Sequence, residues 1–472
     1  MKVKQLVKSG ILYTSASILR QALGFITVPY FAHNTTQESF GLYGLFASYY
    51  SIFVIISGLQ ISSTLGAARV KFDSNFEFYT KSAYNFTFLI SSIFTIMIIL
   101  LKSYFSKWLG FSETIIIFLA IGSLLSVLTN FWGDYLIQTH QTNLNFWREC
   151  FITFISVGLS ILLVHYLSND LFARVIGGIS PMLLLGLCSL IYFGKNNYFY
   201  ISRNYLKFML MTSIPLIFHQ LSSVILSQFD RIMIRQMLSV KDVAVYSFGY
   251  SLGALIQIFL MNLNVAWLPW YIESKKANVN ELKKYIKYYI YIGLFFSLGY
   301  LTISPDLALL MGGEKYSQSN NFIGFIIISM FFIFLDYFPV NVLYFHANTK
   351  YIPIGTVIAG AVNVLLNYYA IPVFGIYGSV IATVLSYLLL LIFHHMIAKQ
   401  IYHYDDLALK DYFKVTSVIV LYNFLMQYFI NSLLIRWVIG ITVLVLYIII
   451  FNKELIFIFK KYDFKHFKRR KL

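Results

Sequence analysis

Long apolar stretches constrain this chain more than any other feature of its sequence. Residues 86–101 and 322–335, for example, each run without a charged side chain. In a hydrocarbon core, a helix satisfies all of its backbone hydrogen bonds within its own segment. The strands of a membrane β-barrel instead alternate apolar and polar residues over about ten positions, and these stretches do not alternate. The sequence therefore predicts an all-α polytopic membrane protein.

The composition agrees with this prediction and excludes other classes of protein. Hydrophobic residues make up 59% of the 472 residues, and charged residues make up 12%. Soluble domains carry about 25% charged residues. Two cysteines are too few for a disulfide scaffold, and the apolar content excludes a disordered chain. The basic N-terminus precedes an apolar stretch that we interpret as a membrane span rather than a cleaved signal.

The number of membrane spans follows from the length of the apolar stretches. About 20 apolar residues cross a hydrocarbon core that is ~30 Å thick. By this measure the sequence predicts about 14 transmembrane helices. The predicted spans are residues 9–31, 41–62, 84–103, 114–138, 150–167, 173–194, 208–236, 243–270, 286–311, 321–346, 352–371, 376–398, 412–431 and 434–452.

The basic residues predict the orientation of these spans, because cytoplasmic segments are enriched in Lys and Arg. With the N-terminus inside, 27 of the 36 Lys and Arg residues fall in cytoplasmic segments and six in outer segments. The other three, Arg20, Arg231 and Arg235, lie within spans. Both termini are therefore predicted to be cytoplasmic. The basic tail at residues 460–471 is expected to meet anionic lipid head groups rather than nucleic acid.

The predicted loops leave no room for a catalytic domain. No outer loop exceeds about a dozen residues, whereas membrane glycosyltransferases and polymerases generally hold their sugar chemistry in a large external loop or domain. Asp405 and Asp406 form the one acidic pair in a loop and are expected to lie in a solvated turn. The sequence contains no GxxxxGK[ST] phosphate loop and no metal-ligand spacing. We therefore expect a protein that is not an enzyme and binds no cofactor or metal.

An internal repeat divides the predicted spans. Residues 40–43 (FGLY) correspond to residues 243–246 (VAVY) at an offset of 203 residues, and both segments begin an even-numbered span. Gly177 and Gly378 correspond at nearly the same offset. The pattern predicts two pseudo-symmetric six-helix lobes, residues 1–200 and 201–400, followed by residues 401–472 with a helix pair and a basic tail. Such repeats are typical of secondary transporters, in which a central cleft alternates its access.

Three segments in this order carry a resemblance to a known family. The chain resembles polysaccharide flippases of the Wzx/PST type, within the multidrug/oligosaccharidyl-lipid/polysaccharide exporter superfamily. Ala244 departs from the family, which commonly has Gly there, and the terminal helix pair leaves the subgroup open. The segments that carry the resemblance are Lys8-Ser9-Gly10 with Arg20, Gly24, Pro29 and residues 40–43; Asp230-Arg231 with Val245-Tyr246; and Asn363 to Asn367 with residues 374–378.

The resemblance implies a function and a set of partners. A family member would move a polyprenyl-diphosphate-linked oligosaccharide across the bacterial inner membrane, for O-antigen or capsule biosynthesis. Its partners would be the lipid-linked glycan, membrane lipids, a polysaccharide polymerase and chain-length proteins. A lipid II flippase and a cation-coupled multidrug exporter of the same superfamily remain as alternatives. The residues alone support a two-lobed transporter with a cationic cleft.

Arginines within the spans are the candidates for binding the diphosphate. Arg20 lies near the middle of the first span, where an Arg costs about 2.5–3.5 kcal/mol and needs a partner or a water-filled cavity. A guanidinium can grip phosphate oxygens bidentately. Arg231 and Arg235 share a helix face in the seventh span. The alternatives are a buried ion pair for Arg20 and an interfacial anchor for Arg231 and Arg235.

Carboxylates and amides within the spans form a second group of candidates. Asp230, Asp336 and Asp134 are candidates for ion pairing or for coupling to a proton or sodium gradient, with Asp134 placed near the cytoplasmic end, where snorkelling or a loop contact is favoured. Interhelical hydrogen bonding is the favoured role of the two asparagines in the eleventh span, and sugar contact is the alternative. The predicted polar lining of the cleft consists of Gln257, Asn262, Asn264, Asn363 and Asn367.

Overall fold

The computed structural model describes residues 23–195, 199–277 and 281–461, together with Leu12, Ser15 and Leu19; side chains are described as far as Phe451. Arg20 lies outside the described residues. Within the described ranges the chain is helical, and no strand occurs. The predicted all-α polytopic fold is therefore confirmed. The chain divides into two compact units, Met1–Ser247 and Phe248–Leu472.

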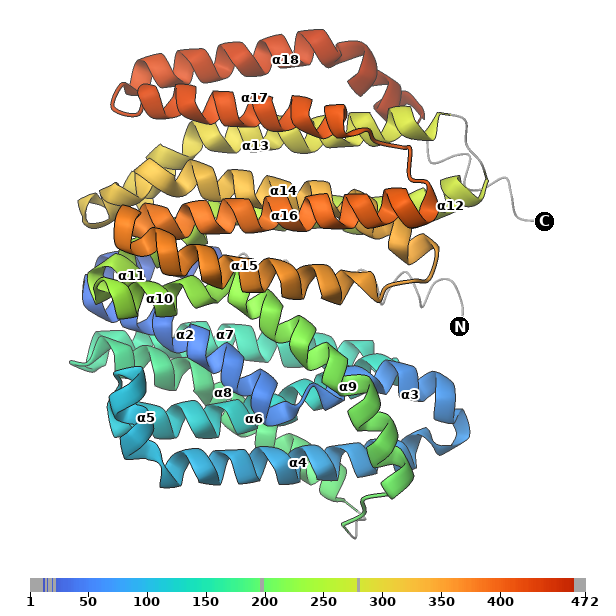
Figure 1. Ribbon diagram of the computed structural model, residues 1–472. Helices are drawn as coiled ribbons and strands as arrows, with labels where there is room; N and C mark the ends of the chain where they lie inside the picture. Colours follow the sequence, from blue (N-terminus) through green and yellow to red (C-terminus); the bar gives the residue numbers. More distant parts are fainter. Residues whose placement is uncertain are drawn as a thin grey trace. The chain divides into compact units, whose positions relative to one another are not determined.

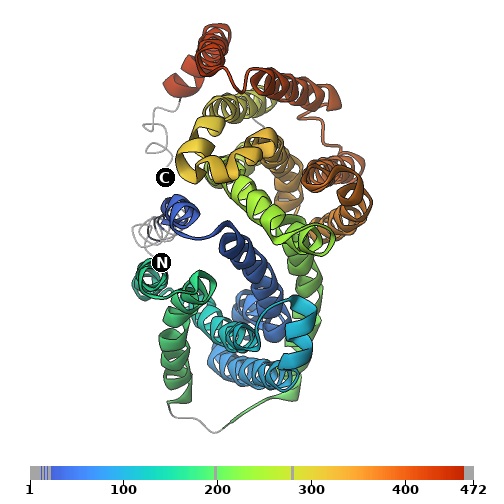
Figure 2. The ribbon, with the colours of Figure 1, turned by 90° about the vertical axis from the view of Figure 1, so that its left-hand side faces the viewer.

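The first unit consists of long helices joined by short ones. Viewed from the side in Figure 2, most of them are seen nearly end-on, so they run roughly parallel or antiparallel to one another. The short helices α3 and α5 lie at opposite ends of the unit (Figure 1). The helices are α2 (Gln37–Gly58), α3 (Leu65–Phe72), α4 (Phe76–Leu100), α5 (Lys102–Leu109), α6 (Glu113–Gln138), α7 (Thr142–Tyr166), α8 (Asp170–Gly194), α9 (Arg203–Val224) and α10 (Asp230–Met237).

The core of the first unit is formed around α6. This helix packs against α2, α4, α7 and α8. Aromatic side chains fill the space between α4, α6 and α8, where Tyr84 stacks on Phe193 and meets Phe131 edge-on. Bulky buried rings of this kind exclude water and fix how the helices pack.

The second unit is built around one buried helix. α14 is buried along most of its length and packs against α12, α13, α16 and α17. α18 packs against α13. The helices that follow α10 are α11 (Val240–Gly253), which crosses the boundary between the units, α12 (Leu255–Lys276), α13 (Leu282–Gly312), α14 (Asn320–Phe345), α15 (Tyr351–Phe374), α16 (Ile376–Tyr402), α17 (Leu409–Tyr428) and α18 (Leu433–Lys461).

Twelve helical segments of the described chain are long and apolar enough to cross a membrane. They coincide with the predicted second to twelfth spans and with the fourteenth. The predicted thirteenth span corresponds to α17, which is not among the twelve. Of the predicted first span, residues 23–34 are helical, and most of the remainder lies outside the described residues.

The predicted seventh and eighth spans are each found as one candidate membrane span, and each contains an irregular turn. A π-helical turn, η3 (Ile225–Phe229), separates α9 from α10. The hydroxyls of Ser223 and Ser227 donate to the carbonyls four residues earlier, a pattern that bends helices. In the eighth span, a tight turn separates α11 from α12. The backbone N–H of Gln257 there donates to the backbone carbonyl of Ala254.

Candidate functional site

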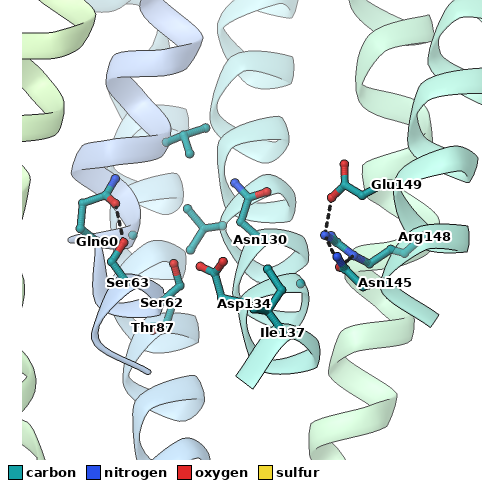
Figure 3. A pocket seen from close by; sticks show the side chains of 14 residues that line it. Gln60, Ser62, Ser63, Thr87, Asn130, Asp134, Ile137, Asn145, Arg148 and Glu149 are labelled. Carbon is teal, nitrogen blue, oxygen red and sulfur yellow. Dashed lines mark hydrogen bonds and ion pairs between the residues drawn. The ribbon is translucent and has the colours of Figure 1, made fainter. Parts of the chain in front are cut away.

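The first unit contains a polar pocket of about 270 Å³ at the end where α3 lies. Asn130 and Asp134 project into it from α6. Figure 3 shows the turn after α2 on one side of these residues and α7 on the other. The remaining polar lining comes from Gln60, Ser62, Ser63, Thr87, Asn145, Arg148 and Glu149.

A strained turn after α2 forms one wall of the pocket. α2 ends at Gly58, and the next two residues, Leu59 and Gln60, have φ angles of 46° and 52°. A positive φ is uncommon for any residue with a side chain, and strain of this kind clusters at functional sites. The turn lets Ser62 reach the carboxyl group of Asp134 (Figure 3).

Arg148 forms the other wall and is held on several sides. Its Nη1 donates to the carbonyl of Thr129 at 2.9 Å, and its Nε and Nη2 donate to Asn145 Oδ1 at 3.2 and 3.1 Å. Nη2 also pairs with Glu149 Oε1 at 2.5 Å. Gly133 on α6 makes room for the guanidinium, because a Cβ there would collide with it. Arg148 therefore ties α7 to α6.

This arrangement suits a polar or cationic ligand better than a phosphate. The Arg148 guanidinium pairs with Glu149, so its charge is largely neutralised. The remaining side chains include the Asp134 carboxyl group, carboxamides and hydroxyls, most of which accept hydrogen bonds. No group of three or more His, Cys, Asp or Glu side chains in the described part of the chain is arranged to hold a metal ion.

A second polar cluster follows the π-helical turn. Asp230 is fully buried and accepts a hydrogen bond from the Tyr246 hydroxyl. Arg231 Nε donates to Ser247 Oγ at 3.1 Å, and its Nη1 donates to the carbonyl of Ser227 at 3.0 Å. A π-turn re-aims the side chains that follow it and is frequent at functional sites. Adjacent residues on a helix point about 100° apart, so Asp230 and Arg231 meet different partners on α11, Tyr246 and Ser247.

The predicted cationic residues differ in their accessibility. Arg231 is buried, whereas Arg235, one turn further on α10, is half-buried and its guanidinium approaches the turn at Gly110. Neither residue lines the pocket of Figure 3.

The second unit contains a buried acid–base pair. His394 Nδ1 on α16 lies 2.8 and 3.0 Å from the two carboxylate oxygens of Asp336 on α14. Gly355 on α15 leaves the space for the imidazole, because a Cβ there would meet Nε2. The sequence indicated Asp336 as a candidate for ion pairing, and the fold supplies His394 as its partner.

The predicted amide lining is partly engaged in contacts of its own. Asn363 and Asn367 are fully buried, and Asn367 Nδ2 donates to the Asn363 carbonyl and side chain at 2.9 and 3.1 Å. Asn264 Oδ1 accepts from Asn341 at 2.9 Å. Asn262 donates to the carbonyl of Ile258, one turn earlier, and Gln257 is half-buried.

Sequence reasoning missed some of these residues and misplaced another. In the sequence, Arg148 and Glu149 look like ordinary residues at the cytoplasmic end of a helix. The only local sign that Arg148 is held in place is Asn145, three residues earlier, which accepts hydrogen bonds from it. The prediction of a solvated turn is wrong for Asp406, which is buried and pairs with Lys275 at 2.8 Å. A long-range cation, invisible in the local sequence, makes that burial tolerable.

Comparisons with known proteins agree with the predicted resemblance. A family model described as polysaccharide biosynthesis protein matches residues 6–275. A protein of the Lsg locus of Haemophilus influenzae is 24% identical over 407 residues, which cover 79% of this chain and 94% of the relative. An uncharacterized membrane protein of the same organism is 23% identical over 365 residues, which cover 75% of this chain and 87% of that relative.

Solved structures share the fold at low identity. The lipid II flippase MurJ, in an inward closed conformation, is 17% identical with a TM-score of 0.65, covering 94% of this chain and 100% of that one. A multidrug resistance MATE family transporter of the MOP superfamily, in its inward-facing conformation, is 15% identical with a TM-score of 0.62. The match covers 82% of this chain and 96% of that transporter.

Proposed function

This chain belongs to the family of polysaccharide biosynthesis proteins, and we propose that it is a flippase that carries a polyprenyl-diphosphate-linked oligosaccharide across the bacterial inner membrane. The observation that carries the proposal is the family match over residues 6–275 of a chain whose described part contains twelve candidate membrane spans. A protein of polysaccharide biosynthesis that lies almost wholly in the membrane suits transport of an intermediate better than synthesis. The product would be an O-antigen or a capsule.

The proposed mechanism is alternating access. Arg20, assisted by Arg235 and Arg231, holds the diphosphate, because guanidinium groups bind phosphate oxygens bidentately. Asn262, Asn264 and Gln257 contact the sugars, and the lipid tail remains in the bilayer. A polymerase and chain-length proteins then receive the glycan on the outer side. Both termini are cytoplasmic, and the basic tail binds anionic lipids.

We further propose that the Asp336–His394 pair couples transport to an ion gradient. Both side chains are buried, and the charge of the pair changes when the His394 imidazole takes up or releases a proton. Asp230 is the second coupling candidate, because it is a fully buried carboxyl group beside Tyr246.

Reconstitution tests the proposal directly. Proteoliposomes would carry labelled polyprenyl-diphosphate oligosaccharide and one of three proteins: wild type, Arg20→Ala or Lys107→Ala. Lys107 is an exposed cation on α5 and serves as the matched control. We expect wild type and Lys107→Ala to expose the glycan on the opposite side, and Arg20→Ala to fail.

Two outcomes would contradict this proposal. Full transport by Arg20→Ala would remove that residue from the diphosphate site while leaving the flippase assignment intact. No transport of several glycans by folded wild-type protein would reject the substrate class. Parallel assays with lipid II and with a cationic dye would then decide between the two alternative functions.

A further inference from the structure

A second polar pocket, of about 540 Å³, lies at one end of the second unit. This volume is within the range of roughly 300–1,000 Å³ that is usual for small-molecule sites. Its walls come from the end of α13, the adjoining turn η4 (Glu314–Ser319), the start of α14 and the turn between α17 and α18. Figure 1 shows these segments at the same end of the unit. The distribution of basic residues predicts that this end faces outward.

The pocket wall is rich in groups that both donate and accept hydrogen bonds. Two segments far apart in the sequence supply them, since Asn431 follows α17 whereas the others adjoin α14. The uncharged polar side chains that line the pocket are Ser317, Gln318, Asn320, Asn321 and Asn431. Carboxamides and hydroxyls of this kind complement the hydroxyl groups of a polyol.

The single cation of the pocket wall is already neutralised. Arg436 is buried and pairs with Asp306, and its Nη1 donates to the carbonyl of Ile430 at 2.9 Å. The indole Nε1 of Trp437 donates to the second Asp306 oxygen at 2.9 Å. A phosphate would have to compete with the Asp306 carboxylate for this guanidinium. The charge balance therefore favours a neutral ligand.

Two buried polar atoms of the wall have no hydrogen-bond partner. One is an acceptor, Asn320 Oδ1, and the other is a donor, Arg436 Nε. Nearly all buried polar groups in folded proteins are paired, so such atoms call for an explanation. Both atoms belong to residues that line the pocket, so its wall has hydrogen-bonding capacity that the protein itself does not use.

We propose that this pocket binds a neutral sugar ring of the glycan on the outer side of the membrane. Asn321 and Asn431 are exposed, line the pocket and contact the sugar hydroxyls. The pocket would hold the head group after translocation. This inference rests on the proposed function, because it takes its ligand from the transported glycan.

Equilibrium binding of free sugars tests the proposal. The full chain in lipid nanodiscs would be titrated separately with galactose, mannose and N-acetylglucosamine, and binding followed by saturation-transfer NMR. We expect at least one sugar to bind to the wild type. We expect Asn321→Ala and Asn431→Ala each to lower the affinity for that sugar about fivefold through a lost hydrogen bond. Gln400→Ala removes an exposed carboxamide from α16, outside the pocket, and should leave binding unchanged.

Three results would overturn the proposal. They are no sugar binding by the folded wild type, binding by both asparagine variants that is as strong as that of the wild type, or displacement of the sugar by inorganic phosphate. The last result would identify an anion site instead. Because no transport occurs in this measurement, a flippase that fails to bind free sugars rejects only the pocket assignment. Sugar binding by a protein that does not flip rejects only the proposed function.

Discussion

Arg148 shows how much a single residue gains from its tertiary surroundings. In the sequence it is one of 27 basic residues that set the predicted orientation. In the fold it is buried and donates to Thr129, Asn145 and Glu149. A buried charge is tolerated only when it is paired and hydrogen-bonded, so its partners must hold their positions.

The contact between Arg148 and Gly133 predicts an effect on stability. Gly133→Ala places a methyl group where the guanidinium lies, so the ion must move and lose hydrogen bonds. We expect a loss of about 1–3 kcal/mol in the free energy of unfolding. Thermal unfolding in detergent would measure it. Gly158→Ala on α7 is the control, because its Cβ meets no atom within 4 Å; equal unfolding midpoints for the two variants would contradict the prediction.

The Asp336–His394 contact predicts a functional coupling. If the pair acts as a unit, Asp336→Asn and His394→Gln each reduce gradient-driven transport by a similar factor, and the double variant is no worse than either one. Transport in proteoliposomes under an imposed proton gradient, and separately under a sodium gradient, would measure this. Additive losses in the double variant would show that the two residues act independently.

At the level of helices, residues that the predicted repeat pairs with one another lie in close contact. A Cβ on Gly41 would lie 2.5 Å from the carbonyl oxygen of Val240 and 2.9 Å from the amide nitrogen of Ala244, its counterpart at the offset of 203 residues. Gly44 lies against Ser247 at the same offset. Small side chains there allow α2 and the start of α11 to approach closely.

The hairpins α7–α8 and α15–α16 repeat this close approach. A Cβ on Gly177 would collide with Ser160, and one on Gly378 would collide with the backbone at Ala370. The sequence pairs these two glycines at nearly the same offset. In the fold, each lies where the two helices of its hairpin approach too closely for a larger side chain.

The start of α17 predicts a dependence on pH. Asp411 accepts from Lys287 at 2.9 Å and from the Ala408 amide at 3.1 Å. Partial burial acts to raise the pKa of its carboxyl group, but these hydrogen bonds outweigh it and hold the pKa below the ordinary value. The ionised carboxyl therefore stabilises the fold at neutral pH, and its contribution is lost as the pH falls below about 4.

This contribution is small, because Lys287 is more than one-third exposed. We expect Lys287→Met to lower stability by about 0.2–1 kcal/mol at pH 7, and by less at pH 3. Thermal unfolding at the two pH values would show this. An equal loss at both would mean that the ion pair is not responsible. Lys414→Met, which replaces an exposed lysine further along α17, is the control.

At the scale of the whole molecule, the charge distribution predicts the sidedness of the protein. In a background with Cys150→Ala and Cys188→Ser, Asn431→Cys should react with a membrane-impermeant maleimide added outside intact cells. His403→Cys should react only after the membrane is opened. Both positions are exposed. The reverse pattern of labelling would invert the predicted topology.

The fold class and the positions of most spans follow from the sequence alone, because a run of about 20 apolar residues is a local property that matches the thickness of the bilayer. The sequence also locates Asp230, Arg231 and Asp336, since a charge within such a run stands out. The partners of these residues depend on the tertiary fold. Asp336 and His394 are 58 residues apart and Asp306 and Arg436 are 130 apart, so no local pattern joins them. Helix breaks and close packing of helices decide which side chains meet, and these depend on the whole fold.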